Sequence, residues 1–113
     1  MFDIVDMEVQ LFSGPTLLGI VKAAIIDESM GVIGGVLLPN NNYFIGFQSS
    51  LRKHNIRPDW NQLGTFELLA FTQASETLKC EGGICITDVE GNEEISVEFC
   101  GLSALAMAEF RRH

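Results

Sequence analysis

The side chains of this sequence that could do nucleophilic chemistry are few, namely three thiols and two imidazoles: Cys80, Cys85, Cys100, His54 and His113. A catalytic thiol needs cationic surroundings that stabilise the thiolate, and no Lys or Arg occurs between Cys80 and Phe110. Neither histidine has a spacing that suggests a base for a serine or a cysteine, and no Gly-x-Ser-x-Gly elbow occurs. We therefore expect no catalytic residue, and the sequence favours a binding protein over an enzyme.

Potential metal and phosphate ligands do not fall into a binding pattern. The spacing Cys80-x4-Cys85 differs from that of zinc knuckles. Oxygen ligands alternate from Asp88 to Glu94 as they do in calcium loops, but Gly91 stands at the fourth position of such a loop instead of the sixth. The glycines of residues 31–35 lack the Lys and Ser or Thr of a phosphate loop. We expect no metal site and no cofactor.

The net charge limits the classes of partner. Fifteen acidic and seven basic residues give a net charge of −8. A nucleic-acid binder needs a basic footprint, and an anionic membrane surface repels a protein of this charge, so we expect neither partner. The imbalance lies in residues 58–113, where ten acidic and three basic residues give −7. This half therefore points to a basic protein partner.

The candidate binding residues form two groups. The first group contains four glutamates of the last predicted hairpin: Glu90, Glu93, Glu94 and Glu98. Projected outward together, they would form a negative surface that steers a basic partner, although a negative surface also serves solubility alone. The second group is Arg57 and Trp60, because Trp and Arg are enriched among binding hot spots. The alternatives are that Trp60 fills the core and that Arg57 belongs to a solvated helix end.

Strand-like alternation dominates the sequence, and the strands must position these residues. Apolar residues occupy the odd positions of residues 5–11, which is the period of a half-buried antiparallel strand. Further strands are predicted over residues 17–26, 32–38, 66–73, 78–80, 84–89 and 95–99. Gly82 and Gly83 predict a hairpin that pairs Cys80 with Ile84. In this register Cys85 lies on the opposite face and forms no local disulfide.

Helical spacing of apolar residues predicts two helices. The first spans residues 42–55, capped by Asn41 or Asn42, and the second spans residues 104–112, capped by Ser103. The expected class is α+β, with residues 1–113 as a single domain. It has a mostly antiparallel, strongly curved sheet or small β-barrel of six to seven strands. One helix is inserted after the third strand, and a short helix ends the chain.

These features predict a small cytoplasmic interaction protein, with the neutralising partner of a basic toxin or nuclease as one version. The first eight residues contain three acids and no base, which argues against a secretory signal. An odd number of cysteines suits reduced thiols in the cytoplasm. The alternative is a domain that binds a small apolar ligand or forms a homodimer, because apolar residues occupy both faces of the strands over 17–26 and 66–73.

Overall fold

The computed structural model describes residues 7–111, without the side chains of Gln62 and Arg111. This part of the chain contains seven strands and four helices. The strands are β1 (Met7–Ser13), β2 (Thr16–Asp27), β3 (Val32–Pro39), β4 (Leu68–Thr72), β5 (Thr77–Leu78), β6 (Gly83–Thr87) and β7 (Ser96–Cys100). The helices are α1 (Asn41–Gly46), α2 (Gln48–Ile56), α3 (Trp60–Thr65) and α4 (Ala104–Arg111).

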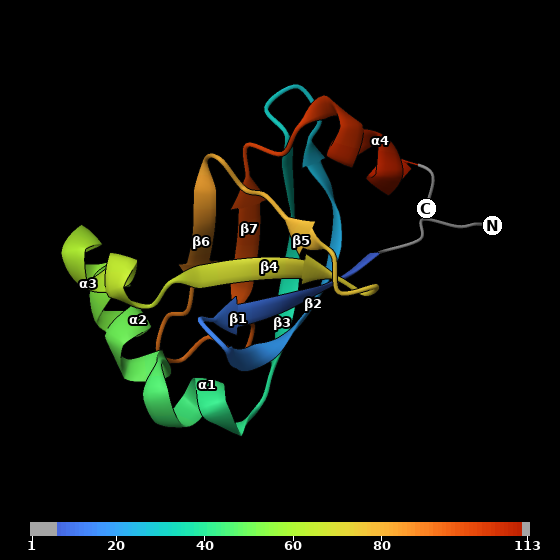
Figure 1. The fold of residues 1–113 in the computed structure, drawn as a ribbon. Helices are drawn as coiled ribbons and strands as arrows, with labels where there is room; N and C mark the ends of the chain where they lie inside the picture. The colour runs from blue at the N-terminus through green and yellow to red at the C-terminus, as the bar shows by residue number, and fades with distance from the viewer. Residues whose placement is uncertain (1–6, 112–113) are drawn as a thin grey trace.

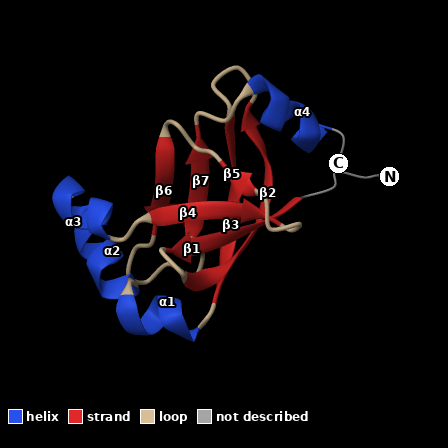
Figure 2. Cartoon of the chain, in the orientation of Figure 1, coloured by secondary structure: helices blue, strands red, loops and turns tan. Residues whose placement is uncertain are grey.

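All seven strands belong to one antiparallel sheet, in the order β5-β4-β1-β2-β3-β7-β6. Helices α1 to α3 lie at one end of this sheet and α4 lies at the other (Figures 1 and 2). The expected α+β class, the antiparallel curved sheet, the helical insertion after the third strand and the short helix near the chain end are confirmed. The sheet is a curled half-barrel.

The curl of the sheet follows from its connections. In a flat sheet, six gaps of about 4.8 Å would separate the edge strands by about 29 Å. The edge strands β5 and β6 are nevertheless joined by only four residues, 79–82. A chain that passes from Leu78 to Gly83 reaches about 18 Å when fully extended. The two edges must therefore approach each other, which bends the sheet around its buried face.

The predicted alternation produces the core. Val9 and Leu11 of β1 are completely buried, and the intervening Gln10 is only partly buried. The same pattern buries Val97 and Phe99 on β7. These side chains meet inside the curl, where the hydrophobic effect stabilises the sheet by about 25 cal/mol per Å² of apolar surface removed from water.

The long insertion after β3 differs from the prediction in its interior. The single helix expected over residues 42–55 is divided into α1 and α2, because Phe47 leaves the helical region with φ −129°. Its ring packs edge-on against Phe66, with the ring centroids 5.2 Å apart. The N-cap is Asn40, whose side chain accepts a hydrogen bond from the backbone of Tyr43. Neither Asn41 nor Asn42 is therefore the cap.

The predicted hairpin around Gly82 and Gly83 is wrong. β5 pairs with β4, and β6 pairs with β7, so Ile84 lies opposite Phe99 and not opposite Cys80. Consecutive strands usually pair, but here Gly82 lies in the connection between the two edges of the curled sheet, and Gly83 begins β6. The backbone N–H of Gly82 donates to the carbonyl of Cys100 on β7. This contact ties the connection to the neighbouring strand.

Candidate functional site

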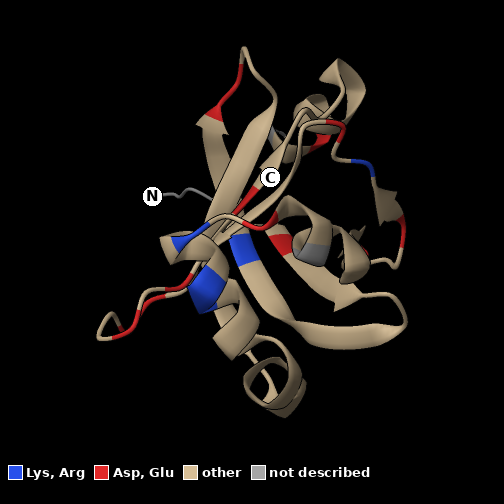
Figure 3. Ribbon diagram, turned by 90° about the vertical axis from the view of Figure 1, so that its left-hand side faces the viewer, with Lys and Arg blue, Asp and Glu red and all other residues tan. Residues whose placement is uncertain are grey.

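The loop between β6 and β7, residues 88–95, presents three carboxylates to solvent. We call these residues the acidic loop. Glu90, Glu93 and Glu94 are all exposed, and Val89 beside them is 48% exposed. In Figure 3 the loop projects from the body of the molecule, with acidic residues along both of its arms. The tip is a tight turn in which the backbone of Asn92 donates to the carbonyl of Val89 at 3.0 Å.

Both ends of the acidic loop are fixed in the interior. Asp88 is completely buried at the first end, and Ile95 is 5% exposed at the other. The carbonyl of Ile95 accepts a hydrogen bond from the backbone of Leu37 at 2.8 Å. The exposed glutamates are therefore carried by a segment whose two ends are anchored to the sheet and to the helices.

A buried hydrogen-bond network around Asp88 forms the first anchor. The Tyr43 hydroxyl donates to Oδ2 at 2.6 Å, and the Gln48 amide donates to the same oxygen at 3.2 Å. The Nε of Arg52 donates to Oδ1 at 3.0 Å. This contact is an ion pair between a side chain 31% exposed and one fully buried. Three donors from α1 and α2 thus satisfy one carboxylate at the end of β6.

The charge state of this network follows from its partners. Burial alone would raise the pKa of Asp88, but hydrogen bonds from Tyr43, Arg52 and Gln48 outweigh it and hold that pKa below its usual value. Burial, together with the adjacent carboxylate, raises the pKa of the Tyr43 hydroxyl. At neutral pH, Tyr43 therefore remains a donor and Asp88 an acceptor. Because its charge is balanced by Arg52, Asp88 adds little to the acidic surface.

The sequence carries a signal for this network. Every second residue from Ile84 through Ile86 to Asp88 lies on the same face of a strand, so strand periodicity continues the inward-facing row to Asp88. Gln48 and Arg52 are four residues apart, which places them on one face of α2. The guanidinium of Arg52 is bound to Asp88.

The four predicted glutamates do not all lie together. Glu98 is exposed on β7, opposite Cys85 of β6 and Gly34 of β3. Glu98 follows Glu94 by four positions, which in extended chain corresponds to about 13 Å. This distance exceeds the Debye length of about 8 Å at physiological salt. Other exposed acids lie elsewhere on the surface: Asp27, Glu28, Asp59, Glu67, Glu76, Glu81 and Glu109. The dense group is therefore limited to Glu90, Glu93 and Glu94.

Arg57 and Trp60 lie at a different surface, where α2 ends and α3 begins. Trp60 is 69% exposed, so the expectation that it fills the core is wrong. Its ring packs edge-on against His54, with the ring centroids 4.6 Å apart. Ile56 is 86% exposed beside Arg57, and Lys53 is also exposed. Lys53 and Arg57 carry positive charge at this corner and Asp59 carries a negative one, so its charge differs from that of the acidic loop.

The thiols lie near one end of β6 and β7. Cys85 is exposed on β6, and Cys100 is half-buried on β7. Burial raises the pKa of Cys100, and the neighbouring Cys85 thiol raises it further. Burial also raises the pKa of Cys80 to about 11. Within residues 7–111, no three His, Cys, Asp or Glu side chains are arranged to hold a metal ion. His113 lies outside the described residues.

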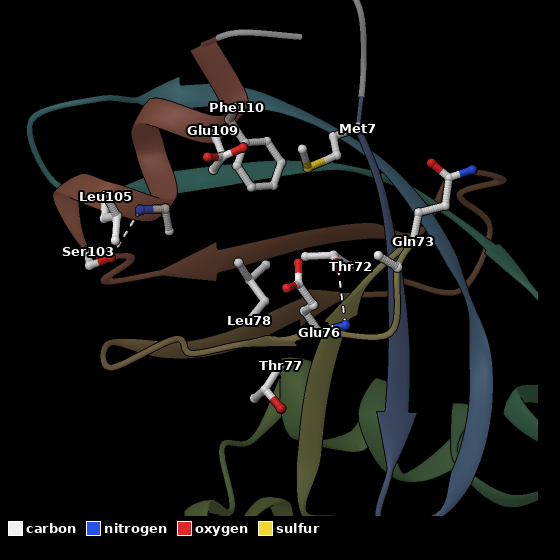
Figure 4. Close-up of a pocket in the computed structure, with 12 residues that line it drawn as sticks. Met7, Thr72, Gln73, Glu76, Thr77, Leu78, Ser103, Leu105, Glu109 and Phe110 are labelled. Carbon is white, nitrogen blue, oxygen red and sulfur yellow. Dashed lines mark hydrogen bonds between the residues drawn. The ribbon is translucent and has the colours of Figure 1, made fainter.

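A hollow of about 750 Å³ lies between α4 and the β4–β5 hairpin (Figure 4). The apolar ligand alternative rested on other residues, on both faces of the second and fourth strands. Two of those side chains pack against other aromatic rings, and Phe71 also lines a smaller hollow together with Phe12 and Pro15. Phe66 contacts Phe47, and Phe71 packs edge-on against Phe12 of β1 with the ring centroids 5.1 Å apart. Sequence reasoning missed the hollow because α4 and β4 are far apart in the chain.

No helix among the described residues is long and apolar enough to span a membrane. The chain matches no family model, no curated protein and no solved structure.

Proposed function

We propose that this protein is a small cytoplasmic interaction protein without catalytic activity, and that its acidic loop binds a basic partner protein. One observation carries the proposal. Three exposed carboxylates, Glu90, Glu93 and Glu94, are held on a loop whose base is fixed by the buried Asp88 network. A neutralising partner of a basic toxin or nuclease is one version, because such an inhibitor must complement a basic cleft.

Anchoring the loop favours binding in two ways. A segment that is already ordered loses less conformational entropy when a partner binds. Fixed charges also keep the negative potential at one place, which accelerates encounter with a basic surface. Val89, 48% exposed next to Glu90, adds an apolar contact that a partner can desolvate. Solubility alone would require no ordered base, so the network around Asp88 supports recognition.

The test compares two variants of equal charge. In the first, Glu90, Glu93 and Glu94 are changed to Gln. In the matched control, three exposed glutamates on other edges are changed to Gln: Glu28, Glu76 and Glu81. Basic proteins captured from a host lysate at low salt by the wild type are purified, and their affinities are measured by surface plasmon resonance. We expect roughly tenfold weaker binding for the loop variant and near wild-type binding for the control.

Salt provides the second readout of this experiment. The association rate of the wild type should fall as ionic strength rises, and this dependence should be weaker for the loop variant. The proposal is overturned if the wild type captures no basic protein at low salt. Equal loss of affinity in the loop variant and the control would also overturn it, because net charge alone would then explain the capture.

The uncovered face of the sheet favours a second candidate function, the homodimer. Ile26, Val36 and Leu38 are 54%, 39% and 55% exposed on β2 and β3. A second copy of the chain would cover these side chains, and the exposed Lys22 lies on the same face of β2. Analytical ultracentrifugation should then find a dimer that Leu38→Lys converts to a monomer. The same change at Ile45, which is 85% exposed on α1, should leave the dimer intact. A wild type that sediments as a monomer at high concentration excludes this candidate.

A further inference from the structure

The hollow beside α4 has an apolar floor. Leu78 of β5 and Phe110 of α4 are each 7% exposed, and Met7 is half-buried at the start of β1. In Figure 4 the Phe110 ring and the Met7 thioether lie across the hollow from Leu78. Leu105, 80% exposed, stands at the rim. The volume of about 750 Å³ falls within the range of about 300–1,000 Å³ for small-molecule sites.

The charges of the lining have one sign. Among the described residues around the hollow, Glu76 and Glu109 carry charge and no Lys, Arg or His occurs. In Figure 4 the Glu76 carboxylate rises from the β4–β5 turn between Leu78 and Thr72 toward the hollow. Glu109 lies next to Phe110 on the opposite wall. A ligand in this hollow would meet apolar carbon below it and carboxylates at two sides.

We propose that this hollow binds a small amphipathic cation, that is, a compact apolar body with an ammonium head. The apolar body would cover Leu78 and Phe110, and the ammonium group would lie by the Glu76 carboxylate. An anionic ligand of the same shape would be repelled by the Glu76 carboxylate. A neutral ligand would gain the apolar contact but no ionic one.

This inference does not depend on the proposed partner binding. Figure 1 places α4 at the end of the molecule opposite the β6–β7 connection, which is the acidic loop. The two sites share no residue, since the lining of the hollow comes from β1, the β4–β5 hairpin and α4. Each site can therefore fail its own test while the other passes.

The experiment uses three probes of equal chain length, n-octylammonium, 1-octanol and octanoate, with the full chain. Binding is followed by the backbone amide shifts in ¹H–¹⁵N NMR spectra. We expect octylammonium to shift the amides of Leu78, Ala106 and Phe110 in a saturable manner. Octanol should bind about two- to fivefold more weakly, which is the contribution of an exposed ion pair, and octanoate should bind more weakly still.

Charge reversal at the hollow sharpens the test. Glu76→Lys should invert the preference, so that octanoate binds better than octylammonium. The matched control is Glu94→Lys, which changes the net charge equally at the far end of the molecule and should keep the preference for octylammonium. Both residues are exposed, so both variants should fold.

Three results would overturn the proposal. The first is that saturating octylammonium shifts no amide of the hollow. The second is that octanoate binds the wild type as well as octylammonium does. The third is that Glu94→Lys changes the preference as much as Glu76→Lys, which would show attraction by net charge without a site.

Discussion

At the scale of single residues, Asp88 decides how the acidic loop is presented. Its carboxylate is fully buried, and donors from Tyr43, Gln48 and Arg52 satisfy both oxygens. These donors lie 36 to 45 residues away in the sequence. The exposed glutamates have no comparable structural role, because they contact solvent. Asp88 thus stabilises the loop, and the proposed recognition rests on the other carboxylates of the same loop.

Removal of the Asp88 carboxylate should destabilise the protein strongly. In Asp88→Ala the Tyr43 hydroxyl and the Arg52 guanidinium lose their common acceptor, and buried polar groups without partners are costly. We expect the free energy of unfolding to fall by about 2–3 kcal/mol. Urea denaturation measures the change, and Glu94→Gln, at an exposed position, should stay within about 0.5 kcal/mol of the wild type. Equal stability of the two variants would contradict the anchoring role.

Acid should weaken the same anchor. The pKa of Asp88 in the folded protein lies below the ordinary value of 3.8. Below about pH 4, the carboxyl of Asp88 is therefore protonated in the unfolded chain while it is still ionised in the folded protein. The stability contributed by this group is present above pH 4 and is lost as the pH falls through the folded pKa. Urea unfolding of the wild type should therefore depend more steeply on pH in this range than that of Asp88→Asn. Parallel pH curves would show that Asp88 has no part in acid unfolding.

At the scale of elements, the insertion α1–α3 is attached to the sheet by its polar side chains as well as its apolar ones. Asn40 caps α1 through its Oδ1, and its Nδ2 donates to the carbonyl of Leu17 on β2 at 2.7 Å. Asn55 on α2 donates to the carbonyl of Ile86 on β6 at 3.3 Å. The helices are thus tied to two strands, which sets the position of the donors around Asp88.

The position of the N-cap of α1 predicts that two neighbouring asparagines differ in their effect on stability. Asn40→Ala removes both hydrogen bonds and should lower the free energy of unfolding by about 1–2 kcal/mol. Asn41→Ala changes an exposed residue of the first turn and should have an effect within about 0.5 kcal/mol. Thermal or urea unfolding of the two variants distinguishes them. A larger effect at Asn41 would place the cap where the sequence alone had placed it.

At the scale of the whole molecule, the curl joins the two edges of the sheet through residues 79–82. β3 can bend closely against its neighbours because Gly35 has no side chain, and a Cβ there would approach the carbonyl oxygen of Lys22 to 2.1 Å. The bent sheet encloses the core on one face and leaves the apolar strip of β2 and β3 on the other. The helices close the ends, so the acidic loop and the α4 hollow lie at opposite ends (Figure 1).

The topology predicts unequal local stability. Strands β1, β2 and β3 are hydrogen-bonded on both sides, whereas β5 is a two-residue edge strand. Amide hydrogen exchange measured by NMR should therefore be slowest in the central strands, and the amides of β5 should exchange through local opening. Protection of Thr77 and Leu78 equal to that of Val9 and Val21 would contradict this order.

The sequence by itself determined the local structure. Alternation in residues 5–11 and 95–99 predicted two half-buried strands, and further strands predicted over residues 17–26 and 32–38 correspond to β2 and β3. Strand periodicity depends on neighbours in the chain. Ser103 was recognised as the cap of α4, and its hydroxyl accepts from the backbone of Ala106 at 3.1 Å. The α+β class and the curvature followed from these elements and from their glycines.

Only the tertiary structure decided which distant elements meet. The hairpin expected at Gly82 and Gly83 is replaced by a connection between the two sheet edges, since β5 pairs with β4 and β6 pairs with β7. The donors to Asp88 come from α1 and α2, and Trp60 lies at the surface beside His54. Such contacts depend on side chains brought together by the curl, and chain periodicity carries no information about partners 36 to 45 residues away.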